Sequence, residues 1–72
     1  MSSQRQTGKI KMISQEKGFG FIRREGLQDL FFHITECVTR DQFAQMAVGS
    51  EVMYDIGQGK RGAEGRDVEL AS

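Results

Sequence analysis

Flat aromatic side chains gather in two short segments, residues 17–22 and 29–33, which hold four of the five phenylalanines and the single histidine. Both segments are rich in residues that favour strands, and a strand directs alternate side chains to opposite faces. The rings that alternation places on one face are those of Phe19, Phe21, Phe31 and His33. If the two strands pair as a hairpin, these rings lie side by side with Lys17 at their edge. Rings beside a cation are suited to stacking on the bases of single-stranded nucleic acid and contacting its phosphates.

A buried aromatic core is the alternative interpretation, because most phenylalanines in strands lie inside a protein. The opposite faces of the same segments are also apolar, however, with Ile22 on the first and Leu30, Phe32 and Ile34 on the second. A small domain has one core, so each strand needs only one apolar face. We therefore predict that the second apolar face is an exposed binding surface.

Two other motifs do not support catalysis or cofactor binding. Residues 57–62 match the dinucleotide fingerprint G-x-G-x-x-G, but that motif must open a helix, and the ten residues that follow Gly62 resemble a strand. His33 and Cys37 supply two ligands where a structural zinc site needs four. A Cys–His nucleophile pair would also need an orienting third group. We expect no catalytic residue, no metal, no cofactor and no enzymatic activity.

The composition narrows the class of protein. Seventy-two residues make one domain, and ten basic residues balance ten acidic ones. Zero net charge argues against a binder that depends on phosphate neutralisation, but it is compatible with one that stacks bases. The lone cysteine, Cys37, is predicted to be a small buried hydrophobe in a reducing, cytoplasmic protein. No apolar run is long enough for a membrane helix and no secretory signal opens the chain, so we expect no membrane association.

Alternating patterns predict five short strands and no long helix. The strands are expected at residues 9–13, 19–23, 29–34, 52–56 and 66–70, with a polar tail at 1–6 and the domain at 7–72. Residues 57–65 are predicted to form a glycine-rich loop, and Thr35 and Asp41 to cap short helical turns. Val52, Tyr54 and Ile56 should point inward, as should Val68 and Leu70. Such short strands predict an all-β fold, a small antiparallel barrel or sandwich.

Residues 17–22, Lys-Gly-Phe-Gly-Phe-Ile, resemble the first ribonucleoprotein motif of the bacterial cold-shock proteins, and residues 30–33, Leu-Phe-Phe-His, resemble the second. The resemblance extends from Gly8 to Leu70. RNA-recognition motif domains share such aromatic motifs but reverse their order and add two amphipathic helices. The resemblance implies a five-stranded antiparallel barrel of the OB-fold type, a cold-shock domain, whose second and third strands face nucleic acid. It assigns contacts to Lys11, Lys17, Phe19, Phe21, Phe31, His33 and Phe43.

The chain departs from the pattern of this family at three positions. Met12 and Ile13 stand where a tryptophan and a phenylalanine are usual, and Ile34 replaces a further aromatic residue. These changes predict weaker binding or a shifted base preference. Strict alternation would turn Met12 inward with Ile10, whereas a bulge in the first strand would bring it to the surface. We include Met12 in the expected binding surface, together with two cations of the glycine-rich loop, Lys60 and Arg61.

Two functions follow as hypotheses. The first is a non-enzymatic binder of single-stranded RNA, single-stranded DNA or both. The resemblance implies for it a role as an RNA chaperone or as a stress-responsive regulator of transcription or translation. The second is a protein-interaction or self-association barrel that uses the same aromatic face. We expect a monomer or a weak homodimer.

Overall fold

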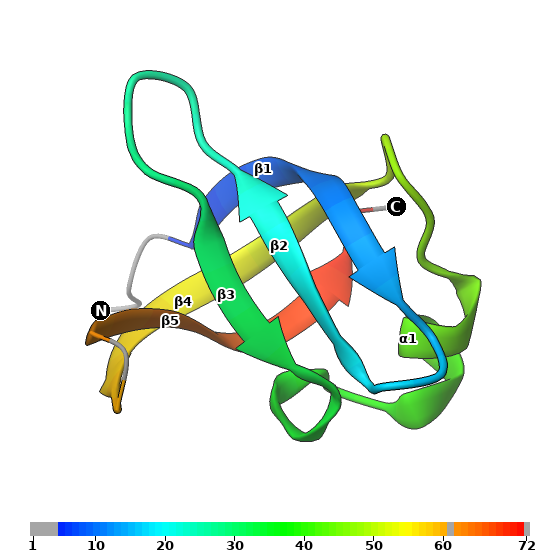
Figure 1. Cartoon of the computed structure of the whole chain (residues 1–72). Helices are drawn as coiled ribbons and strands as arrows, with labels where there is room; N and C mark the ends of the chain where they lie inside the picture. The colour runs from blue at the N-terminus through cyan, green and yellow to red at the C-terminus, as the bar shows by residue number, and fades with distance from the viewer. Residues whose placement is uncertain (1–4, 61, 72) are drawn as a thin grey trace.

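Short runs of β-branched and aromatic residues, separated by turns that contain glycine, fold into five strands. The structure, a computed structural model, describes residues 5–60 and 62–71 (Figure 1). The strands are β1 (Gln6–Ser14), β2 (Phe19–Arg23), β3 (Leu30–His33), β4 (Glu51–Gly59) and β5 (Gly62–Leu70). A short 3₁₀ helix, η1 (Ile34–Glu36), and one helix, α1 (Arg40–Gln45), connect β3 to β4.

The strands close into a barrel in the order β1-β2-β3-β5-β4, with β4 pairing back to β1. Four of the five neighbouring pairs are antiparallel. β3 and β5 run parallel and share one register pair, Phe31 with Glu64. The predicted five-stranded barrel is therefore confirmed, but its sheet is mixed rather than purely antiparallel. The reason is that η1, α1 and β4 intervene between β3 and β5, and only such a crossover joins parallel strands.

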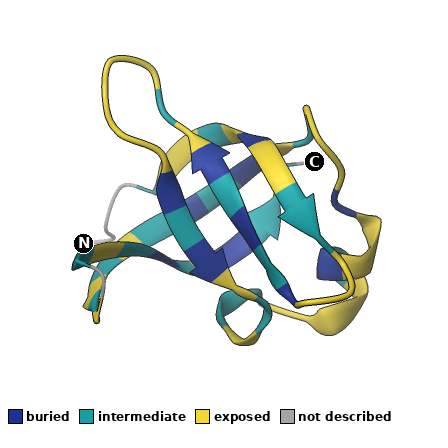
Figure 2. Ribbon diagram, viewed as in Figure 1, coloured by how far each residue is buried: buried dark blue, intermediate teal, exposed yellow. Residues whose placement is uncertain are grey.

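Alternation along β2 and β3 separates a buried face from a partly exposed one (Figure 2). As predicted, Ile22, Leu30 and Phe32 are buried. Gly20 leaves room for this packing, because a Cβ atom there would lie 3.0 Å from the Phe32 ring and 2.9 Å from the Met12 carbonyl oxygen. The buried hydrophobic core contains Ile10, Ile22, Leu30, Phe32, Phe43, Met46, Val52, Tyr54 and Val68. Two residues that were expected inside, Cys37 and Leu70, are only partly buried and pack against this core.

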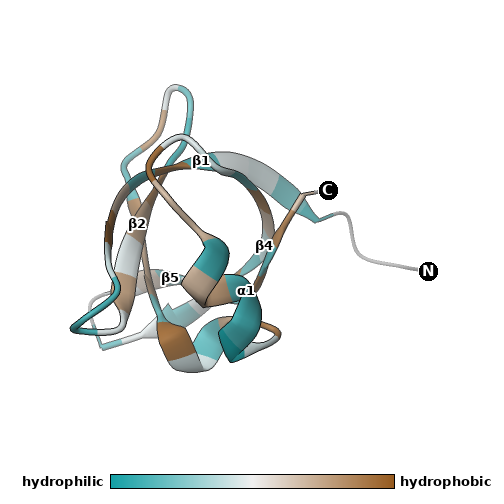
Figure 3. Cartoon of the chain, turned by 90° about the vertical axis from the view of Figure 1, so that its right-hand side faces the viewer, coloured by the Kyte–Doolittle hydropathy of each residue, from teal (hydrophilic) through white to brown (hydrophobic). Residues whose placement is uncertain are grey.

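Helix α1 covers one end of the barrel (Figure 3). Its Phe43 is buried in the core, and Gln15 Nε2 holds the C-terminal end of the helix by donating to the Phe43 carbonyl at 2.7 Å. The side chain of Thr39 caps the helix by accepting from the Gln42 amide. The predicted caps, Thr35 and Asp41, are wrong, because each lies two residues after the observed N-cap. An N-cap is the last extended residue before the first turn. For η1 that residue is His33.

The predicted glycine-rich loop at residues 57–65 is largely strand. β4 continues to Gly59 and β5 begins at Gly62. The long side chains of the neighbouring strand lie over two glycines here, because a Cβ atom on Gly57 would meet the Arg66 side chain and one on Gly59 the Glu64 carboxylate. Ile56 is 46% exposed, so its predicted place in the core is wrong.

The N-terminal boundary also lies earlier than expected. Gln6 begins β1, and Arg5 Nη1 donates a hydrogen bond to Asp55 Oδ2 at 3.0 Å. The Arg5 guanidinium further donates to the carbonyl oxygens of Met53 and Asp67. Arg5 and Gln6 therefore belong with the barrel, and the rest of the predicted tail, residues 1–4, lies outside the described residues.

Candidate nucleic-acid interface

Three partly exposed phenylalanine rings lie together on the outer face of β2 and β3, and we call Phe19, Phe21 and Phe31 the aromatic patch. The ring centroids of Phe19 and Phe31 are 5.8 Å apart, and the ring planes are tilted by 31°. Phe21 meets the other two edge to face, at 6.2 Å from Phe19 and 5.7 Å from Phe31. Such edge contacts hold the rings in place and leave ring surface open to solvent.

The strand register explains why the patch forms. Phe21 lies opposite Phe31, and Phe19 lies opposite His33. Directly opposed residues on paired antiparallel strands share one face of the sheet and approach closely. The predicted side-by-side arrangement of these four aromatic residues is therefore confirmed as a geometry.

Met12 extends the patch onto β1. The register between β1 and β2 shifts between Ile10 and Met12, and this irregularity brings Met12 opposite Phe21. The Met12 side chain is 40% exposed, whereas Ile10 is 2% exposed. An extra residue in one strand reverses the faces that follow it, which is why strict alternation fails here. The surface position expected for Met12 is thus confirmed.

His33 is oriented by the start of η1. Its Nδ1 accepts a hydrogen bond from the Thr35 amide at 3.2 Å and lies 3.1 Å from Thr35 Oγ1. These contacts hold the exposed ring in a fixed orientation, so it presents a flat surface beside Phe19.

The predicted cations differ in their surroundings. Lys17 is exposed in the turn between β1 and β2, and Lys60 is exposed in the turn after β4. Lys11 Nζ is 2.7 Å from Asp29 Oδ2, with the two side chains 59% and 32% exposed. An exposed pair of this kind is weak, so a phosphate would compete with Asp29 for Lys11. Arg61 lies outside the described residues.

Phe43 is not part of the surface. It is 1% exposed, and its ring packs edge to face on Phe32 with centroids 6.2 Å apart. The predicted contact of Phe43 with nucleic acid is therefore wrong, because α1 turns this side chain into the barrel. Ile13 and Ile34 are partly buried and pack against the same core, so they do not continue the aromatic patch.

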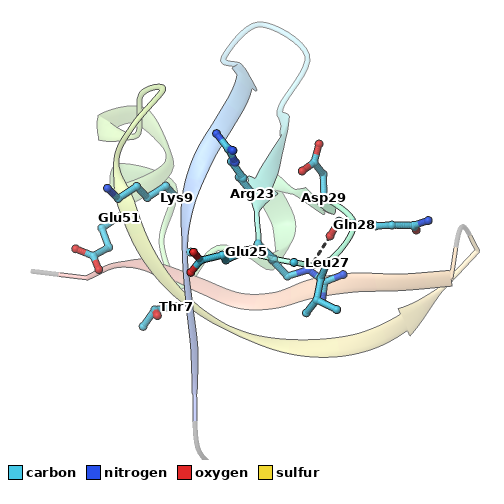
Figure 4. Close-up of a pocket in the computed structure, with 11 residues that line it drawn as sticks. Thr7, Lys9, Arg23, Glu25, Leu27, Gln28, Asp29 and Glu51 are labelled. Atoms are coloured by element: carbon cyan, nitrogen blue, oxygen red, sulfur yellow. Dashed lines mark hydrogen bonds between the residues drawn. The ribbon is translucent and has the colours of Figure 1, made fainter.

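Two exposed cations in the structure lie close to the patch and were missing from the expected surface. These cations are Lys9 on β1 and Arg23 on β2, which lie opposite each other. Arg23 comes two residues after Phe21 along β2. The alternation that grouped Phe19 with Phe21 also places Arg23 on that face, and this signal was available in the sequence. Beside this pair, an open cleft of about 790 Å³ lies between β1 and the loop that joins β2 to β3 (Figure 4).

The described residues offer neither a cluster of metal ligands nor a helix suited to a bilayer. No group of three or more His, Cys, Asp or Glu side chains is placed to hold a metal ion within residues 5–60 and 62–71. No helix in that part of the chain has the length and apolar character required to span a bilayer.

Comparison with known proteins places this geometry in context. The sequence model of the 'cold-shock' DNA-binding domain matches residues 6–71, which include all five strands and the aromatic patch. Cold shock-like protein CspE of Bacillus anthracis is 42% identical over 62 residues, covering 86% of this chain and 91% of that protein. Cold shock protein CspC of Bacillus subtilis (strain 168) is 41% identical over 64 residues, covering 89% and 96%. Cold shock-like protein CspD of Bacillus cereus is 43% identical over 63 residues, covering 88% and 94%.

Proposed function

The chain belongs to the cold-shock domain family of nucleic-acid-binding proteins, and we propose that it binds single-stranded RNA and DNA by stacking bases on the aromatic patch. The observation that carries this proposal is the cluster of three partly exposed rings, with centroids 5.7 to 6.2 Å apart, beside the exposed Met12 and His33. Apolar rings gathered on a protein surface favour a flat, apolar ligand. Unpaired bases are such ligands, whereas the bases of a duplex are already stacked on one another.

The proposed binding would act on RNA structure without chemistry. A protein that binds only the unpaired form shifts the equilibrium towards that form by mass action. No nucleotide hydrolysis is needed for this effect. We therefore place the protein among RNA chaperones or regulators that keep transcripts unpaired.

Titration of a fluorescent heptanucleotide, at low and at moderate salt, tests the proposal. The single strand should bind, and the duplex of the same sequence should bind far more weakly. Phe31→Ala should weaken single-strand binding by about 1–3 kcal/mol, the range found for one base–aromatic stack. Val48→Ala is the matched control, because Val48 is 69% exposed and lies between α1 and β4, outside the patch. Equal affinity for duplex and single strand would contradict the proposal.

Self-association is a second candidate, and the same patch supports it. Three partly exposed rings on a protein with zero net charge have little electrostatic repulsion to keep two copies apart. Sedimentation of the free protein distinguishes the two functions. A dimer that Phe31→Ala disrupts, in a protein that ignores the heptanucleotide, would support self-association instead.

A further inference from the structure

Lys9 and Arg23 form a pair of like charges on the outer face of the barrel. They are directly opposite each other across β1 and β2, and both are exposed. Opposed residues in an antiparallel pair have Cα atoms about 4.5 to 5.5 Å apart. Like charges in that relationship destabilise a sheet. The fold therefore tolerates an unfavourable contact at this position.

Among the described residues, neither cation forms an ion pair, although Glu51 lies opposite Lys9 across β1 and β4. Of the four ion pairs found there, two involve Arg5, one joins Lys11 to Asp29 and one joins Arg66 to Glu36. Lys9 and Arg23 also donate no side-chain hydrogen bond in the part of the chain that the structure describes, although ten acidic residues are present in the sequence. Two such cations, side by side, suit a shared anion.

The position of the pair relative to the patch suggests which anion. Phe21 and Arg23 are two residues apart on β2, so they share a face and lie about 7 Å apart along the strand. A strand stacked on the aromatic patch and extended towards the loop between β2 and β3 would pass over Lys9 and Arg23. The anion available at that point is the phosphate backbone.

Acidic side chains define where the strand would run. Glu25 and Glu51 line the cleft beside the pair, and Figure 4 shows Glu25 reaching across towards β1. Their carboxylates repel a phosphate from the interior of the cleft. The backbone is therefore expected to stay on the rim, over Lys9 and Arg23, instead of entering the cleft.

We propose that Lys9 and Arg23 form a phosphate subsite that binds the backbone of a single strand where it leaves the aromatic patch. The subsite rests on the proposed single-strand binding. It adds a phosphate contact at one end of the proposed binding surface. It contacts phosphates and no bases, so it should increase affinity without adding sequence preference.

Oligonucleotides with an abasic extension test the subsite directly. A heptamer is compared with the same heptamer carrying two abasic nucleotides at its 5′ end, or at its 3′ end, so that phosphates are added without bases. One of the two extensions should tighten binding by the natural protein. Arg23→Gln and Lys9→Gln should each remove part of that gain. Each should also reduce the slope of log K against log salt by about 0.7, or about fivefold in affinity per tenfold change in salt.

Arg40→Gln is the matched control, because it removes the same charge from exposed α1 at the covered end of the barrel. It should leave the gain unchanged. Glu25→Gln should act in the opposite direction and increase the gain, since it removes a repelling charge. Arg23→Gln should not lower the melting temperature, because it relieves the repulsion from Lys9.

The outcomes separate this inference from the proposed function. If the heptamer binds and depends on Phe31, but neither extension adds affinity, the subsite is overturned and the stacking surface stands. A gain that persists in both Gln variants overturns it as well. If Arg23→Gln lowers the melting temperature and weakens the affinity for all three oligonucleotides equally, Arg23 is a structural residue and the subsite is overturned. A natural protein that fails to bind the heptamer overturns both proposals.

Discussion

Met12 lies opposite Phe21, and both side chains face outward, because the register of β1 against β2 shifts between Ile10 and Met12. A methionine thioether is flexible and polarisable, so it is suited to lie against a flat ring but offers no ring of its own. This one relationship places an aliphatic side chain at the edge of a surface that is otherwise aromatic.

Replacing Met12 with tryptophan should tighten single-strand binding. A base–aromatic stack is worth about 1–3 kcal/mol, and it would replace the weaker interaction of the thioether, so a net gain of about 1 kcal/mol, or about fivefold, is expected. Titration of the heptamer and a thermal melt on the same variant measure both effects. Ile13→Trp is the control, because Ile13 packs against the core and a larger side chain there should cost about 1–3 kcal/mol of stability. Unchanged affinity with a lowered melting temperature for Met12→Trp would remove Met12 from the site.

Phe43→Ala and Phe31→Ala should have opposite consequences. Phe43 is buried against Phe32, so its truncation should cost about 3–5 kcal/mol of stability. Phe31→Ala should weaken binding and cost less stability, because its ring is partly exposed. Urea unfolding and heptamer titration on each variant separate the effects. The milder variant Phe43→Leu keeps the protein folded, and its affinity should match that of the natural protein. A binding loss in Phe43→Leu without any loss of stability would return Phe43 to the surface.

Arg5→Ala should destabilise the barrel by about 1–2 kcal/mol, because hydrogen bonds to charged groups are worth more than neutral ones. The Arg5 guanidinium ties Asp55 and Glu69 to the start of β1 and also donates to two backbone carbonyl oxygens. Arg5→Lys should recover only part of the stability, since an ammonium group lacks the planar fork of the guanidinium. Arg40→Ala, on the exposed face of α1, should change the free energy of unfolding by less than about 0.5 kcal/mol. Equal effects for Arg5→Ala and Arg40→Ala would show that the contacts of Arg5 contribute nothing.

Cys37 should react slowly with thiol reagents while the protein is folded. Burial, and to a smaller extent the Glu36 carboxylate, raises the pKa of the Cys37 thiol to about 11. The unfolded chain has an ordinary thiol with a pKa of about 8.5, so at pH 8 unfolding should speed alkylation by about two orders of magnitude. Rates measured from pH 7 to 11, with and without denaturant, test this.

The same shift has a definite sign for stability. The folded state binds the thiol proton more tightly than the unfolded state does. The protonated Cys37 thiol therefore makes its full contribution to the free energy of unfolding below a pH of about 8.5. This contribution is lost as the pH rises towards 11. Glu36→Gln should move the titration of Cys37 downward only slightly, because burial is the larger cause. An ordinary thiol pKa in the folded protein would contradict the burial of this side chain.

Local alternation was sufficient to predict the faces of β2 and β3. Phe19 and Phe21 stand outward and Ile22 inward because a strand of five residues leaves no room for a change of phase. The same rule failed for Met12, where a register shift in β1 is set by pairing with β2 and not by local sequence. The surface position of Phe43 was implied by the family resemblance and not by alternation, and its burial depends on α1 lying across the end of the barrel.

The glycines of β4 show a second limit of local reasoning. Gly57 and Gly59 resemble a flexible loop in the sequence, yet they lie in a strand where the side chains of Arg66 and Glu64 cover them. Glycine serves both purposes, and only the neighbouring strand distinguishes them. The Lys9–Arg23 pair likewise depends on how β1 and β2 are aligned. Its members are fourteen positions apart in the chain, so local sequence does not reveal that they are neighbours.

Closure of the barrel gives each of the five strands two neighbours, so none of them is an edge strand along its whole length. Exposed edges are the usual template on which strands of other copies add and propagate into fibrils. A protein that partly exposes three phenyl rings and has zero net charge would otherwise be prone to aggregation. The ring of strands shortens the stretches of backbone on which another copy could add a strand. Closure thus lowers the risk of strand addition in a small protein whose surface carries an apolar patch.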